Sequence, residues 1–162
     1  MDDAQVVAAR VRQISVETGG GRVDVVGHSR GGLVARAAKQ IVGEARIGRV
    51  VTVSSANQGL HMGALDRAAG AVLPEGMQQI RRGSDLIEQL HATRGDADLV
   101  AVGTRGFDGV LAPRISARIE NSAFRSVDIG RTSGPMSHVG HYGILRDAAA
   151  YEAIRGALLT GG

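Results

Sequence analysis

Three short apolar runs constrain the fold of this chain more than any other feature of its sequence. They cover residues 23–26, 50–53 and 99–102, and each is nearly continuous in apolar side chains instead of alternating with polar ones. Such runs are typical of parallel strands that are covered on both faces of a sheet. A weaker candidate covers residues 125–130. The sequence therefore predicts about four strands, mostly parallel.

Apolar residues recur at helical spacing between and around these runs. We expect a helix in each periodic segment, which are residues 4–17, 32–42, 84–90 and 148–159. A chain in which helices alternate with parallel strands folds into an α/β layer structure with right-handed crossovers. We therefore predict a single α/β domain over residues 1–162, with helices on both faces of the sheet.

The composition excludes several classes of function. Because no cysteine is present, disulfides, zinc–thiolate sites and a thiol nucleophile are ruled out. The net charge of +3 comes from arginines that are spread along the chain and not grouped into a stripe. With two phenylalanines, two tyrosines and no tryptophan, a base-stacking surface is not expected either. We therefore predict no nucleic-acid partner.

Signals for membrane insertion or export are not found in the sequence. No run reaches the roughly 18 apolar residues that a membrane span requires. The opening residues, MDDAQVVAARVRQ, lack the basic and then apolar pattern of a signal peptide. The sequence thus predicts no transmembrane segment, and it leaves the localisation open between secreted and cytoplasmic.

The stretch VDVVGHSRGG places Ser29 directly behind the first predicted strand and before a predicted helix. A G-x-S-x-G pattern in this context is typical of a nucleophile elbow, where the serine adopts a strained backbone with positive φ. Gly27, Gly31 and Gly32 would leave room for the neighbouring strand and helix. The backbone N–H of Arg30 would face a developing oxyanion. The alternative is an ordinary glycine-rich turn with a solvent-exposed serine.

A serine nucleophile needs a base, and the base needs an acid to orient it. In a parallel sheet, reacting groups gather at the carboxyl ends of the strands. Asp108 follows the third predicted strand at that end and is the candidate acid, although an Asx-turn aspartate is the alternative. Four other aspartates fit less well, because they enter a strand from the wrong end, lie on a helix or lie within a strand: Asp96, Asp98, Asp85 and Asp128.

Five histidines compete for the role of base. His28 adjoins the serine, so we expect its side chain to point away from the hydroxyl and to pack behind the site. His61 and His91 lie between the second and third predicted strands. His138 and His141 lie in the loop before the last helix, where a base could reach the serine. Their spacing also suits a metal pair, but no carboxylate-rich third ligand accompanies them, so we predict no metal site.

Several segments resemble the α/β-hydrolase superfamily, and within it the compact bacterial lipases and esterases. VDVVGHSRGGLVAR resembles the family's nucleophile elbow and following helix, and VVTVSSANQG resembles its next strand and loop, with Ala56 in place of a proline. RRGSDLIEQLHA is similar to a short lid-side helix, and FDGVLAP to the turn that carries the acid. VGHYGILRD is similar to the histidine loop, which commonly reads V-G-H-x-G-L-L.

The resemblance implies a partial α/β-hydrolase fold and a serine carboxylic-ester hydrolase. Such an enzyme acts on a small ester or a lipid, needs no cofactor and works through an acyl-enzyme. The site residues that the resemblance implies are Ser29 as nucleophile, Asp108 as acid, His141 as base, the N–H of Arg30 as an oxyanion donor, and His28 and His138 as supporting neighbours.

The chain departs from the family pattern at its start. The family has several strands before the elbow, and a loop among them donates the second oxyanion N–H, whereas nothing in residues 1–22 resembles these parts. We therefore expect the C-terminal portion of the family fold, with an exposed edge on its first strand that invites self-association. The alternatives to an active esterase are a truncated or inactive hydrolase fragment and a hydrolase-like interaction module completed by a partner chain.

Overall fold

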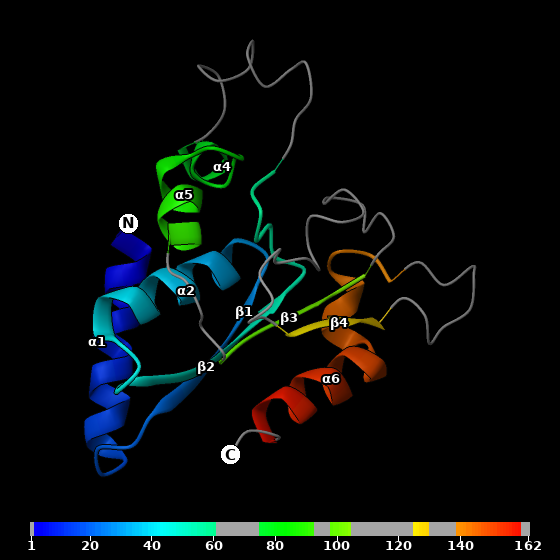
Figure 1. Ribbon diagram of the computed structural model, residues 1–162. Coiled ribbons are helices and arrows are strands. Elements are labelled where there is room, and N and C mark those ends of the chain that lie inside the picture. Colours follow the sequence, from blue (N-terminus) through cyan, green and yellow to red (C-terminus); the bar gives the residue numbers. More distant parts are fainter. Residues whose placement is uncertain (1, 61–74, 93–97, 105–124, 130–138, 160–162) are drawn as a thin grey trace.

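Four parallel strands form one sheet at the centre of the structure (Figure 1). The computed structural model describes residues 2–60, 75–92, 98–104, 125–129 and 139–159. The strands lie across the sheet in chain order, as β1 (Val23–His28), β2 (Ile47–Val53), β3 (Leu99–Gly103) and β4 (Arg125–Asp128). The prediction of an α/β fold with about four parallel strands is confirmed.

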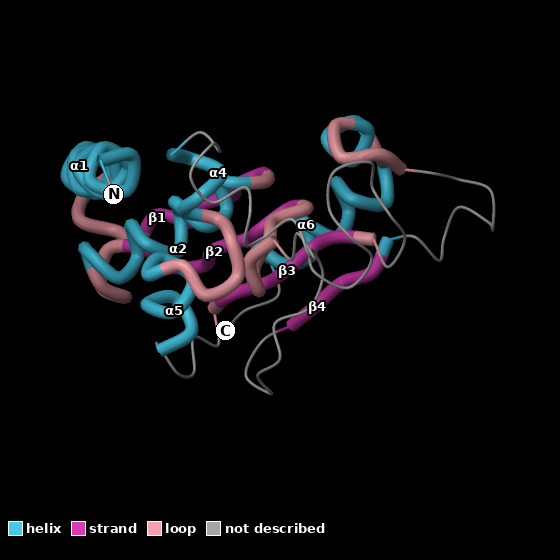
Figure 2. The backbone as a smooth tube through the Cα atoms, turned by 90° about the horizontal axis from the view of Figure 1, so that it is seen from above, coloured by secondary structure: helices cyan, strands magenta, loops and turns pink. Residues whose placement is uncertain are grey.

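Helices cover both faces of this sheet (Figures 1 and 2). On one face lie α1 (Asp2–Glu17) and α2 (Arg30–Val42), with α5 (Asp85–Ala92) packed beside α2. On the other face lies α6 (Ala148–Leu159), which follows the 3-10 helix η2 (Gly143–Arg146). A short helix, α4 (Glu75–Gln79), precedes α5. The sequence did not predict α4 and η2, because elements of five and four residues are too short to show a helical period.

Buried side chains alternate between the two faces along β2 and β3. Val50 and Leu99 pack toward α1 and α2, whereas Val51 and Val102 pack toward α6. All of β3 and all but one residue of β2 are buried. Helices on both sides therefore explain why these strands read as continuous apolar runs.

β1 is less buried than its sequence suggested. Val23 and Val25 pack against the cluster under α1 and α2, but Asp24 and Val26 point to the opposite face and are exposed. In the described part of the chain, β1 pairs only with β2 and lies at an edge of the sheet. The prediction that this run is buried on both faces is wrong for β1, since α6 packs over β2 and β3 instead.

A buried arginine ties α2 to the loop after β2 and to α5. Arg36 is 6% exposed and donates to the carbonyl and side-chain oxygens of Asn57 at 3.3 and 3.2 Å. It also donates to the carbonyl of Leu90 at 3.0 Å. Because a buried charge is costly without partners, these acceptors fix the loop after β2 next to the carboxyl end of the sheet.

The structure also bears on membrane insertion. Among the described residues, none of the helices combines the length and the apolar character that crossing a bilayer demands.

Candidate functional site

The backbone of Ser29 turns sharply between β1 and α2. Its φ is 55° and its ψ is −127°, as predicted for a serine at an elbow. Its N–H donates to the carbonyl of Val53 at 2.8 Å, which continues the pairing of β1 with β2 by one residue. A non-glycine residue in this region is strained by roughly 1–3 kcal/mol, so the surrounding hydrogen bonds must hold it there.

The side chain of Ser29 does not serve the helix that it precedes. Ser29 is the N-cap residue of α2, yet it makes no side-chain capping hydrogen bond. Its Oγ lies instead 2.9 Å from Nε2 of His141, a residue 112 positions away in the sequence. A serine at this position ordinarily stabilises the helix by about 1 kcal/mol through capping. The elbow directs the hydroxyl to an imidazole instead.

Two of the three elbow glycines are required by close packing. A Cβ on Gly27 would collide with the carbonyl oxygen of Gly31, and a Cβ on Gly32 would collide with the side chain of Ser55. A Cβ on Gly31 would meet nothing within 4 Å. The expectation that all three positions need glycine is therefore wrong for Gly31, whose Cβ would project into open space.

His141 is 4% exposed and is held from two sides. The Nε2 of His28 lies 2.8 Å from the carbonyl oxygen of His141, and the two imidazole rings are 4.7 Å apart. The ring of Tyr142 meets the ring of His141 edge-on at 5.3 Å. His28 thus packs against His141, as expected of a neighbour of the site, and the expectation that its side chain points away from the Ser29 hydroxyl stays a prediction. Sequence reasoning also missed Tyr142, for which no motif gives a signal.

Arg30 contributes a backbone donor and a charged side chain. Because α2 begins at Arg30, its N–H is one of the first-turn donors that have no acceptor within the helix. Its guanidinium donates to Asp3 on α1 at 2.6 Å and to Gln79 on α4 at 3.3 Å. The residue after the serine thus joins the elbow to two helices.

The structure brings together some of the predicted site residues, and others lie outside the described residues. Ser29 and His141 are in contact, and Arg30 adjoins them at the start of α2. Asp108 and His138 lie outside the described residues, so their roles stay predictions. Among the described residues, no group of three His, Cys, Asp or Glu side chains is arranged to hold a metal ion.

Two aspartates that the sequence analysis set aside are now placed. Asp98 binds Arg22 at 2.6 Å next to the amino ends of the strands, so it was rightly excluded. Asp128 lies within a strand as predicted, and it is the last residue of β4. It pairs in register with Gly103, the last residue of β3, and is half-buried. Asp128 therefore lies at the carboxyl edge of the sheet and is a second candidate acid.

Ser54 is a strained residue beside the elbow. It directly follows β2, has a φ of 42° and is completely buried. Its N–H donates to the carbonyl of Val102 at 2.9 Å, but its hydroxyl has no hydrogen-bond partner among the described residues. Both the left-handed backbone and the unsatisfied hydroxyl cost stability.

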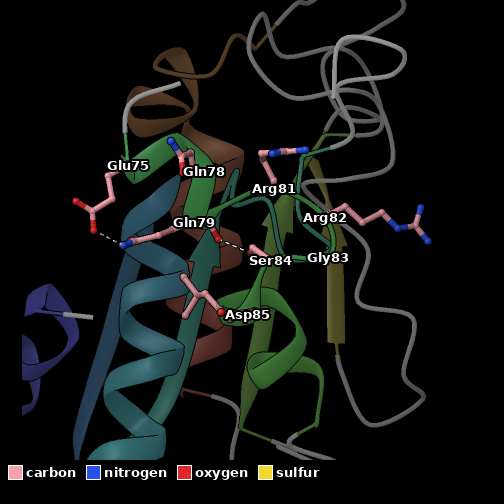
Figure 3. A pocket seen from close by; sticks show the side chains of 9 residues that line it. Glu75, Gln78, Gln79, Arg81, Arg82, Gly83, Ser84 and Asp85 are labelled. Atoms are coloured by element: carbon pink, nitrogen blue, oxygen red, sulfur yellow. Dashed lines mark hydrogen bonds between the residues drawn. The ribbon is translucent and has the colours of Figure 1, made fainter. Parts of the chain in front are cut away.

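A polar cavity of about 410 Å³ lies between α4 and the start of α5 (Figure 3). Its lining carries both signs of charge, with Glu75 and Asp85 opposing Arg81 and Arg82. Figure 3 shows the two arginines extending away from Glu75, so the charges do not converge on one point. The lining includes neither the candidate nucleophile nor the candidate base. This cavity therefore adds no group to the candidate site.

Comparisons with solved structures show a hydrolase-like fold. The chain is similar to phospholipase PlaB from Legionella pneumophila in complex with thio-NAD, with a TM-score of 0.50 and 21% identity over 67% of this chain. A second structure of PlaB aligns with a TM-score of 0.49 and 18% identity over 68% of this chain. The alignments span 26% and 28% of the two PlaB chains. At such identities the likeness shows the fold alone. Neither a protein-family model nor a curated protein matches the sequence.

The different surroundings of Gly27 and Gly31 can be tested with a matched pair of alanine variants. We expect Gly27→Ala to lower the free energy of unfolding by about 1–3 kcal/mol, because the added methyl group meets backbone that cannot move away cheaply. We expect Gly31→Ala to stay within about 0.5 kcal/mol of the unchanged chain. Urea denaturation measures both values. Equal losses in the two variants would contradict this packing.

The strain at Ser54 predicts a stabilising substitution. Ser54→Gly should raise the free energy of unfolding by about 1 kcal/mol, because glycine adopts a positive φ without the Cβ penalty. Ser54→Ala, which keeps the backbone strain and removes only the unsatisfied hydroxyl, is the control and should gain less. The midpoint and slope of chemical denaturation give both values. A loss of stability on changing to glycine would show that Ser54 is not strained.

Proposed function

We propose that this chain is a lipase-like serine carboxylic-ester hydrolase, with Ser29 as the nucleophile and His141 as its base. The observation that supports this most is the 2.9 Å separation of Ser29 Oγ and His141 Nε2. The hydroxyl makes this contact from a strained elbow while leaving the helix N-terminus uncapped. A partly exposed serine whose hydroxyl contacts a buried histidine is the arrangement that serine acyl transfer requires.

The proposed reaction follows from these positions. His141 Nε2 accepts the proton of Ser29 as Oγ attacks the ester carbonyl carbon, and the carbonyl oxygen becomes an oxyanion. The N–H of Arg30 donates a hydrogen bond to that oxyanion. The intermediate then breaks its bond to the alcohol oxygen, which takes the proton from His141 and leaves an acyl-enzyme. Water, deprotonated by His141, attacks the acyl carbon, and the carboxylic acid leaves as Ser29 recovers its proton.

We propose Asp108 as the acid that orients His141. The resemblance of FDGVLAP to the family's acid turn supports Asp108, whereas the position of Asp128 at the carboxyl edge of the sheet supports the second candidate. An acid partner keeps the imidazole in the tautomer whose Nε2 is free to accept a proton. One aspartate suffices for this role, so the two assignments exclude each other.

The substrate class is proposed to be a carboxylic ester of a lipid or small alcohol. The likeness of the fold to a protein named as a phospholipase supports a lipid ester, and the resemblance to lipases and esterases supports the same class. The alignment covers 26% of that phospholipase chain, and among the described residues we assign no second oxyanion donor. Because a missing donor costs about 10²–10³-fold in turnover, slow hydrolysis is expected from these residues alone.

A second proposed property is self-association through β1. Val26 is 46% exposed on β1, which among the described residues pairs only with β2, and an unpaired strand edge is a template for pairing with another chain. We propose that a second copy of the chain binds there. Such an interaction does not require catalysis. It would therefore also be expected if the chain is an interaction module and not an enzyme.

Substitution of the proposed catalytic residues tests the esterase directly. Ser29→Ala and His141→Ala should each reduce p-nitrophenyl ester turnover and fluorophosphonate labelling to background, a loss of about 10⁴-fold or more where the assay range permits. His138→Ala should keep most of the activity. Labelling of another serine in the unchanged chain would contradict the assignment of Ser29.

The same assay separates the two candidate acids. Asp108→Asn should lower turnover by about 10⁴-fold or to background, because an asparagine holds the wrong imidazole tautomer. Asp128→Asn should leave most of the turnover. The opposite pattern would transfer the role of the acid to Asp128.

A lysine on the sheet edge tests the self-association. Light scattering should show a mass that rises with concentration for the unchanged chain and a monomer for Val26→Lys, because a charge on an edge strand opposes pairing. Val16 on α1 is 72% exposed, so Val16→Lys is a matched control that should still associate. A monomeric unchanged chain, or equal disruption by both lysines, would contradict the interface.

A further inference from the structure

We infer that His28 is a positioning residue, which holds the backbone of His141 so that the imidazole of His141 meets the hydroxyl of Ser29. The inference rests on the proposed function and deepens it, because it names a residue that acts on the reaction through the base. Its foundation is a hydrogen bond between residues 113 positions apart, from Nε2 of His28 to the carbonyl oxygen of His141, at 2.8 Å.

The consecutive residues His28 and Ser29 thereby contact the same residue, His141, at its backbone and at its side chain. His28 binds the backbone carbonyl of His141, and Ser29 contacts the imidazole of the same residue at 2.9 Å. Consecutive residues of a regular strand point to opposite faces, so both would not ordinarily reach the same partner. The left-handed backbone at Ser29 removes this obstacle, because it turns the hydroxyl toward the side where His28 already points.

The chemistry of the contact fixes the role of each atom. A carbonyl oxygen only accepts hydrogen bonds, so Nε2 of His28 carries the proton and donates it. His28 therefore does not offer Nε2 as a base in this arrangement. The two rings lie 4.7 Å apart and are tilted by 47°, so His28 also limits the movement of the His141 ring.

The segment that carries the base has an apolar anchor on its other side. Ile144 on η2 is 1% exposed and packs in the cluster beneath α6, while its N–H donates to the carbonyl of Gly140 at 3.0 Å. His141 thus lies between an anchor in the core and the hydrogen bond from β1. Displacing a catalytic group by about 1 Å costs on the order of 10²-fold in rate, so loss of the second anchor should affect the chemical step.

The chain offers a matched control in His91. Its Nε2 lies 3.0 Å from the carbonyl oxygen of Asn57, so it makes the same kind of hydrogen bond from a histidine to a backbone carbonyl. His91 lies on α5, and no contact joins it to the serine or the base among the described residues. Comparing His28→Ala with His91→Ala therefore separates positioning of the base from the general loss of such a bond.

The experiment measures ester turnover and the rate of fluorophosphonate labelling in the full chain. His28→Ala should lower kcat and the labelling rate by about 10–100-fold with little change in KM, whereas His91→Ala should change neither beyond about twofold. His28→Gln should recover most of the loss, since its side-chain amide can donate to the same carbonyl. Equal rates in the two alanine variants, or no recovery by glutamine, would overturn the inference.

A second measurement does not depend on activity. Hydrogen exchange of the segment 139–146 should become faster in His28→Ala and stay unchanged in His91→Ala, because only the first variant frees the carbonyl of His141. Unchanged exchange in both variants would overturn the inference even if the esterase is active. If the unchanged chain neither labels nor turns over ester, the proposed function fails, and exchange alone then decides whether His28 holds His141.

Discussion

The left-handed backbone of Ser29 is the constraint on which the rest of the site depends. At a φ of 55°, the residue leaves the plane of β1 while its N–H still donates to Val53. This geometry withdraws the hydroxyl from helix capping and directs it to His141, while the N–H of Arg30 at the start of α2 has no acceptor within the helix. Strain of this kind persists only where the surroundings enforce it. Here the close approach of Gly27 to the backbone of Gly31 helps to hold Ser29 in this conformation.

The sheet places the distant parts of the site at one edge. Because all four strands are parallel and pair in chain order, their carboxyl ends lie together. The core under α6 then anchors His141, since Ile144 packs there three residues further along the chain. The other face supports the elbow through α2, whose buried Arg36 holds the loop after β2. Burial on two faces thus fixes both halves of the Ser29–His141 contact.

The fold was predictable to the extent that burial leaves a mark on the sequence. Continuous apolar runs indicated parallel strands, and the glycines around Ser29 indicated the elbow. The contact of His28 with His141 was not predictable, because the two residues lie 113 positions apart and no motif pairs them. The positive φ of Ser54 carries no signal, since no glycine marks it. The end of β4 at Asp128 was not predictable, because the end of a strand is set by pairing with its neighbour and not by the apolar run.

The shared hydrogen bond of Ser29 and His141 is tested most directly by the ¹⁵N NMR spectrum of the His141 imidazole. Spectra of the unchanged chain and of Ser29→Ala should show Nε2 as the unprotonated nitrogen in both. The Nε2 resonance should shift strongly when the hydroxyl is removed, while Nδ1 shifts little, because only Nε2 faces Ser29 at 2.9 Å. Identical Nε2 resonances in the two proteins would contradict the hydroxyl–imidazole pair, and a protonated Nε2 in the unchanged chain would contradict the hydroxyl as its donor.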